Sequence, residues 1–195
     1  MTAPIGQAAA PLERAQGGAA PTTWRVVPES SRAEFVIGKR LFFVKHLRVP
    51  GRFGGVTGTV TLDGAQPSTA RVELAIDAAT VDTDHARRDT HLRNADFFDV
   101  EQHPAITFVS RTVEPVDAAA GRYRATGDLT IRTVTHSVTL DVQVTPPDAH
   151  SGQGPAHIIA TTVLNRHDLG LTLTNPVMKV ADEARVTVEL NVVPQ

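Results

Sequence analysis

The stretch SVTLDVQVT, residues 137–145, decides the fold. Apolar and polar residues alternate in it without interruption, which is the pattern of a β-strand with one buried and one exposed face. The apolar face carries Val138, Leu140, Val142 and Val144. The pattern predicts a strand whose aliphatic side chains lie against a core.

The same alternation recurs on both sides of this stretch. It is clear in RVELAID (71–77) and RVTVELNVV (185–193), and turn-forming sequences such as DGAQPS and PPDAHSGQGP separate the segments. Weaker versions occupy residues 33–38, 55–63, 105–113, 121–132 and 157–166. We predict an all-β domain, a single antiparallel barrel of about eight strands, because closure leaves no unpaired strand edge. A two-sheet sandwich fits the same pattern.

Two parts of the chain lack the strand pattern. Residues 82–100, DTDHARRDTHLRNADFFDV, are dense in charge and predict a connection with a turn or two of helix. Residues 1–22 are rich in alanine, glycine and proline and predict a disordered tail. The barrel domain is therefore expected over residues 23–195.

Composition narrows the function. The 195 residues carry a formal net charge of -2, which provides no basic field for nucleic acid. With no cysteine there is no disulfide, no thiolate metal site and no cysteine nucleophile. No apolar run approaches the ~20 residues of a membrane span, and the N-terminus lacks the layout of a secretion signal. We expect a soluble, cytoplasmic protein.

Three segments, taken in order, resemble one known family. They are ATVDTDHARRDTHLRNADFFDVEQHPAITFVS (79–110), TGDLTIRTVTHSVTLDV (126–142) and LNRHDLGLTLTNPVMKVADEARVTVEL (164–190). Together they are similar to the YceI-like family of polyisoprenoid-binding proteins. The resemblance implies a lipocalin-like barrel that holds an isoprenoid chain in an apolar tunnel, with the polar head group near the mouth.

One position departs from the family pattern. Thr133 stands after Ile131 and Arg132, where the family usually turns with glycine. If the turn required a positive φ there, threonine would fit it badly. We therefore expect a different turn type in this hairpin.

The candidate site residues form two groups. Seven apolar residues are candidates for the cavity wall: Phe35, Phe53, Phe97, Phe98, Phe108, Leu140 and Leu190. Interior phenylalanines either fill a barrel or line its cavity, and the sequence leaves both roles open. The resemblance implies structural ion pairs or turn hydrogen bonds for a second group, Arg88, Asp89, His91, Asp128, Arg132, Arg166 and Asp168.

Two sharper chemical interpretations receive little support. A metal site is suggested by five clustered side chains, Asp82, Asp84, His85, Asp89 and His91. The same stretch contains Arg87, Arg88 and Arg93, which neutralise the carboxylates without an ion. No serine lies in a Gly-x-Ser-x-Gly turn. We predict no metal, no cofactor and no catalytic residue.

The segment RLFFVKHLRVPGRFGGV is basic and partly apolar. Its cations are Arg40, Lys45, His46, Arg48 and Arg52. We favour a strand and turn with solvated cations. The alternative is a mouth loop that meets a pyrophosphate or a membrane surface.

These observations favour a non-catalytic binding or carrier protein for a long-chain isoprenoid or similar amphiphilic lipid. The alternatives are an enzyme that acts on such a lipid, and a stress-related structural or interaction protein with an incidental cavity. The expected partners are the lipid and, at most transiently, a membrane surface, with no nucleic acid. A homodimer is an open alternative to a monomer.

Overall fold

The computed structural model describes residues 22–41, 45–62, 70–146, 155–172 and 178–195. The strands are β1 (Thr22–Val26), β2 (Arg32–Leu41), β3 (Lys45–Phe53), β4 (Val56–Leu62), β5 (Arg71–Asp77), β6 (Ala105–Asp117), β7 (Arg122–Ile131), β8 (Val134–Thr145), β9 (Ala156–Asn165) and β10 (Met178–Pro194). The helix α1 spans Ala86–Arg93, between β5 and β6. The predicted tail lies outside the described residues except for Thr22, which begins β1.

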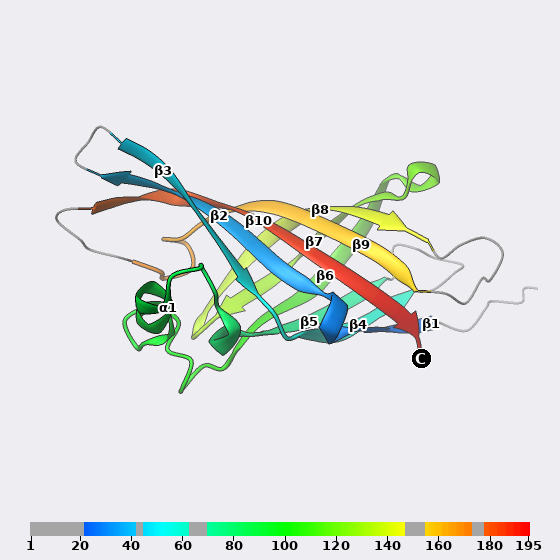
Figure 1. Cartoon of the computed structure of the whole chain (residues 1–195). Coiled ribbons are helices and arrows are strands. Elements are labelled where there is room, and N and C mark those ends of the chain that lie inside the picture. The colour runs from blue at the N-terminus through cyan, green and yellow to red at the C-terminus, as the bar shows by residue number, and fades with distance from the viewer. Residues whose placement is uncertain (1–21, 42–44, 63–69, 147–154, 173–177) are drawn as a thin grey trace, which may run out of the picture.

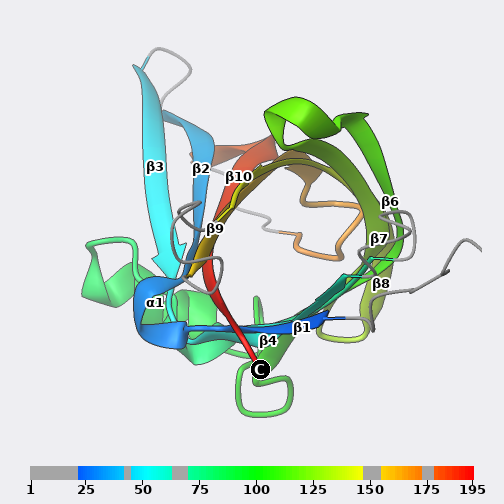
Figure 2. The ribbon, with the colours of Figure 1, turned by 90° about the vertical axis from the view of Figure 1, so that its right-hand side faces the viewer.

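The strands form a closed antiparallel barrel (Figure 2), as predicted. Along the sheet the order is β1-β4-β5-β6-β7-β8-β9-β10, and β1 also pairs with β10, so eight strands close the ring. The sandwich alternative is thereby set aside. The alternation in SVTLDVQVT has the expected sense, since Val138 is buried while Thr139 and Asp141 are exposed.

The remaining strands, β2 and β3, extend the wall at one end of the barrel. The long strand β10 pairs with β1 near its C-terminal end, Val192–Pro194, and with β2 over its earlier residues. The switch occurs beside Asn191, whose N–H donates to Ser31 Oγ over 3.0 Å while its carbonyl accepts from Val27 N over 2.8 Å. A short 3-10 turn, Pro28–Ser30, separates β1 from β2 at this corner.

The connection that contains α1 lies beside β3 at the same end of the barrel (Figure 1). Arg52 of β3 and Asp82 exchange both backbone hydrogen bonds, at 2.8 and 2.9 Å. Arg93 fixes the far end of α1 by donating from Nε to Ala79 O and from a terminal nitrogen to Val81 O, each over 2.7 Å. The short helical connection predicted near residues 82–100 is confirmed.

The β7–β8 hairpin explains why Thr133 is acceptable. Ile131 pairs with Val134, so Arg132 and Thr133 form a two-residue turn. The left-handed residue is Arg132, with φ 56, and not Thr133. The turn type therefore requires no glycine at position 133.

The main core lies inside the ring and beneath α1. The largest of its fully buried side chains are Val26, Val56, Val81 and Val192. They belong to β1, β4, the segment before α1 and the end of β10, and none of them lines the cavity described below. The part of the ring nearer β2, β3 and α1 is hollow.

Candidate ligand-binding site

A cavity of about 390 Å³ lies inside the barrel, and its wall is almost entirely apolar. It is bounded by strands β2, β3 and β5 to β10 and by the α1 connection. The larger apolar side chains of its wall include Phe35, Ile37, Phe53, Leu74, Ile76, Leu92, Phe97, Phe98, Ile106, Phe108, Leu129, Ile131, Leu140, Leu164, Leu171, Val186 and Val188. Such a lining suits a hydrocarbon chain and offers little to a charged group.

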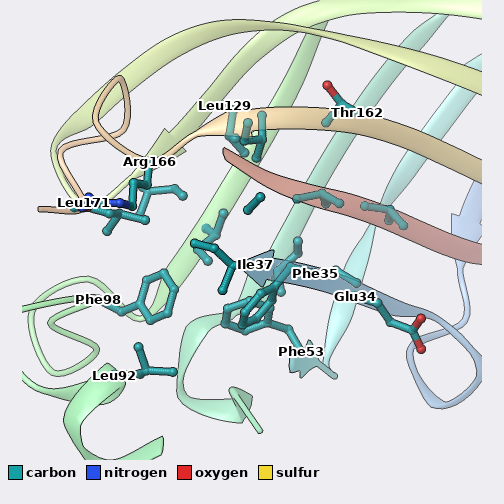
Figure 3. Close-up of a pocket in the computed structure, with 18 of the residues that line it drawn as sticks. Glu34, Phe35, Ile37, Phe53, Leu92, Phe98, Leu129, Thr162, Arg166 and Leu171 are labelled. Atoms are coloured by element: carbon teal, nitrogen blue, oxygen red, sulfur yellow. The ribbon is translucent and has the colours of Figure 1, made fainter. Parts of the chain in front are cut away.

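Four aromatic rings run in series along one side of the cavity (Figure 3 shows three of them). The ring centroids of Phe35 and Phe53 are 5.7 Å apart, and those of Phe53 and Phe98 are 5.4 Å apart with an interplanar angle of 78°. Phe97 meets Phe98 edge to face at 4.7 Å. The rings join β2 and β3 to the α1 connection, so this wall depends on both elements.

The predicted cavity residues are distributed between wall and core. Six of the seven line the cavity, namely Phe35, Phe53, Phe97, Phe98, Phe108 and Leu140. Leu190 does not; it is 2% exposed and packs with Val26 and Val192 in the core. It lies on the inward face of β10 as expected, but beyond Val188, the last residue of β10 that lines the cavity. Contact with a ligand remains a prediction for all seven residues.

The connection from β9 to β10 folds inward at the hollow end, where residues 165–172 lie within the outline of the ring (Figure 2, orange). Leu169 and Leu171 are buried, and Leu171 lines the cavity. Arg166 anchors the segment: its side chain is only 10% exposed and donates to Leu171 O and Ala181 O over 3.0 and 3.1 Å. The guanidinium is thus occupied by the protein itself.

Asp182 completes this anchor. Its carboxylate accepts from His167 Nε2 at 2.8 Å and from Arg166 at 3.0 Å. The hydrogen bond from His167, followed by that from Arg166, lowers the pKa of Asp182. The anchor therefore joins the end of β9 to β10 through a carboxylate that stays ionised in mild acid.

A buried polar network holds the start of the α1 connection. Asp89 is 5% exposed and accepts from the backbone N–H of Thr83 at 3.0 Å and from the Thr83 hydroxyl. Arg88 donates from Nε to the same hydroxyl and from a terminal nitrogen to Thr83 O, each over 2.7 Å. Thr83 thus links Arg88 to Asp89, and the stem of Arg88 is left to line the cavity.

The other residues of the predicted structural group make weaker contacts. Arg132 donates to Phe97 O over 3.3 Å and ties the β7–β8 turn to the α1 connection. Asp128 pairs with Arg111 at 3.1 Å on the outer surface. Asp168 is 51% exposed and lies 3.9 Å from His136, while His91 is exposed at the rim of the cavity.

The clustered acidic and histidine side chains do not converge. No three of the His, Asp and Glu side chains in the described ranges are placed to hold a metal ion. Asp82 and Asp84 instead pair with Arg52. The backbone N–H of Asp84 and, after it, Arg52 lower the pKa of Asp82.

Arg48 and Arg52 of the basic segment are exposed on β3. The side chains of Arg40, Lys45 and His46 lie outside the described part. Arg52 pairs with Asp82 and Asp84, and a head-group contact by this segment stays a prediction.

Sequence reasoning missed several wall residues. Ile37, Val186 and Val188 lie on the inward faces of strands whose sequence alternates between apolar and polar residues. The signal that identified Leu140 therefore also applied to them. Leu171 carried no such signal, because it lies in an aperiodic connection, where Arg166 donates to its carbonyl.

A closed antiparallel barrel around an apolar cavity is the lipocalin-like class of fold. Within it, the chain belongs to the YceI-like family: the YceI-like domain matches residues 24–192. A UPF0312 protein of Shewanella baltica strain OS185 is 32% identical over 158 residues, 74% of this chain and 80% of its own length. Protein YceI of Escherichia coli O157:H7 is 32% identical over 140 residues, 72% of this chain and 71% of its own. A UPF0312 protein of Pectobacterium atrosepticum is 40% identical, but over only 53% of this chain and 54% of its own.

Solved structures confirm the fold. Burkholderia cenocepacia BcnA superposes with a TM-score of 0.70 at 22% identity, covering 85% of this chain and 98% of BcnA. The Campylobacter jejuni YCEI protein gives 0.58 at 26% identity, with 77% and 90% covered. A polyisoprenoid binding domain from Saccharophagus degradans gives 0.60 at 17% identity, with 88% and 98% covered. In the described ranges, no helix has the length and hydropathy to cross a membrane.

Proposed function

We propose that this protein binds and carries a long-chain isoprenoid, or a similar amphiphilic lipid, without transforming it. The observation that carries the proposal is the apolar cavity of about 390 Å³ inside the barrel. Its volume falls within the ~300–1,000 Å³ of ordinary ligand sites. The surface that the described residues present to it is almost entirely apolar, which favours a hydrocarbon tail over a polar ligand.

The magnitudes agree with tail recognition. Each isoprene unit has five carbons, so its full burial contributes at most about 4 kcal/mol at ~0.8 kcal/mol per CH₂. Three buried units would exceed ~10 kcal/mol, which is comparable with the ~4–15 kcal/mol lost on association. Tail burial is therefore large enough to dominate the affinity.

The head group belongs at the hollow end of the barrel, beside the α1 connection and residues 166–172. Two arginines reach the cavity there, and both donate hydrogen bonds within the protein. Arg88 donates to Thr83, and Arg166 donates to Leu171, Ala181 and Asp182. An exposed ion pair with a head group would add only about 0–1 kcal/mol. The head group then sets the orientation of the ligand rather than its affinity.

The family membership supports the same proposal. The Saccharophagus degradans domain of this fold is described as polyisoprenoid-binding. An enzyme that acts on the tail would need polar groups deep in the pocket; in the described residues the deep wall is formed by side chains such as Leu74, Phe108 and Leu140. A carrier is therefore preferred to an enzyme or to a structural protein with an incidental cavity. A cytoplasmic location stays a prediction, which cell fractionation tests.

Native mass spectrometry of the purified full chain tests the proposal. We expect a mass increment that disappears in organic solvent, with an isoprenoid or long-chain lipid recovered in the extract. A matched variant, Phe108→Asp, should lack the increment, because it leaves a charge in an apolar wall. A chain that carries no lipid and binds no added prenyl alcohol would overturn the proposal.

A further inference from the structure

A second, smaller apolar cluster lies beyond the cavity. It consists of Ala70, Val113 and Ala125, with Tyr123 and Val142 packed against it. Its buried members are two alanines and a valine, which lie before β5, on β7 and on β6. None of these five residues lines the cavity.

Leu140 borders both the cavity and this cluster. It lines the cavity and packs against both the main core and the second cluster, a combination shared by no other residue in the described ranges. Its cross-strand partner on β7 is Ala125, which is 3% exposed. On the other side of β8, Val142 pairs with Ala160, another small side chain of the wall.

We propose that Leu140 is the residue that sets the longest tail the cavity accepts. The inference rests on the proposed function, because it assigns a residue to the inner end of the lipid tail. A tail that enters from the hollow end and passes Phe108 meets Leu140 before it can reach the second cluster. The alanines of the cluster, Ala70 and Ala125, contribute little bulk, so the leucine is the main side chain between the cavity and the space that they leave.

The size of that side chain gives the expected effect. Leu→Ala removes three carbons beside Ala125 and the second cluster, whereas an isoprene unit has five. The shortened side chain should therefore extend the cavity by roughly half an isoprene unit, because the neighbours relax only partly into the space. A larger side chain at the same place should shorten it by a similar amount.

The test is a calorimetric titration of the full chain with prenyl alcohols, each one isoprene unit longer than the last. For the wild type, affinity should rise with length and then level off. In Leu140→Ala the levelling should move to longer tails, and in Leu140→Phe it should move to shorter tails. The control is Leu164→Ala, a wall residue of the main core on β9 that does not pack on the second cluster. It should weaken binding of every tail without moving the levelling point.

The outcomes separate the two proposals. Since the Leu140 variants act in opposite directions, a shift of the predicted sign in either one supports the partition. If the wild type levels off and both variants level off at the same length as the wild type, the role of Leu140 is wrong and lipid carriage stands. If the affinity of the wild type does not depend on tail length, the proposed function itself is wrong.

Discussion

The ring of Phe35 lies over Gly51, the residue directly opposite it on β3. A Cβ atom at Gly51 would come within 2.2 Å of Phe35 Cζ, a distance that no folded structure tolerates. Glycine at this position therefore allows the first ring of the aromatic series to lie flat against the wall. The arrangement fixes the shape of the cavity where β2 and β3 leave the closed ring.

Gly51→Ala should accordingly displace the Phe35 ring and cost about 1–3 kcal/mol of unfolding free energy, as overpacked sites do. Chemical denaturation followed by circular dichroism measures the change. The matched control is Gly54→Ala, because a Cβ at Gly54 meets nothing within 4 Å. The double variant with Phe35→Ala should lose less stability than the sum of the single variants. Equal losses at Gly51 and Gly54 would contradict the account.

Leucines of the core and of the cavity wall should differ in their contribution to stability. Leu190 is packed on all sides, so Leu190→Ala should cost about 2–5 kcal/mol of unfolding free energy. Leu164 faces the cavity, so Leu164→Ala removes fewer contacts and should cost less than Leu190→Ala. Denaturant unfolding of the lipid-free protein compares the two. A larger loss at Leu164 would indicate that the cavity is filled by the protein itself.

Arg166 and Asp168 lie in one motif but should behave differently. Arg166→Ala removes the donor to two backbone carbonyls and to Asp182 at a nearly buried position, and should cost about 2–3 kcal/mol of unfolding free energy. Asp168 is half exposed, and its one ion-pair partner in the described residues, His136, is as far as 3.9 Å away. Asp168→Ala should therefore change stability by less than about 0.5 kcal/mol. Thermal melting of both variants decides; a larger loss at Asp168 would refute the anchor at Arg166.

The free energy of unfolding should fall in acid as the carboxylates of Asp82 and Asp182 become protonated. The pKa values of Asp82 and Asp182 are lower in the folded state than in the unfolded chain, so the folded protein binds fewer protons. Their contribution is present above the unfolded pKa of ~4 and is lost as the pH falls through the folded values. The double variant Asp82→Asn, Asp182→Asn should therefore lose less melting temperature than the wild type when the pH is lowered from neutral to ~3. Parallel curves would contradict these assignments.

The fold was largely predictable from the sequence because strand alternation is a local signal. SVTLDVQVT and RVELAID have one buried face each, and both lie in the predicted barrel. The extension by β3 was harder to foresee, since Pro50 and Gly51 interrupt the pattern and the strand owes its place to pairing with β2. Local signals also cannot separate cavity from core: Leu140 and Leu190 occupy equivalent inward positions, and only their height in the barrel distinguishes them.

The central claim is that burial of the tail, not recognition of the head group, supplies the affinity. Titration of the protein with prenyl alcohols and prenyl pyrophosphates of matched tail length tests it most directly. The dissociation constant should fall with each added isoprene unit until the cavity is full, because a buried unit contributes up to about 4 kcal/mol. At equal tail length the alcohol and the pyrophosphate should differ by less than a few added units do, since an exposed ion pair contributes about 0–1 kcal/mol. Affinity that is flat across tail lengths and strongly dependent on the phosphate would contradict the claim.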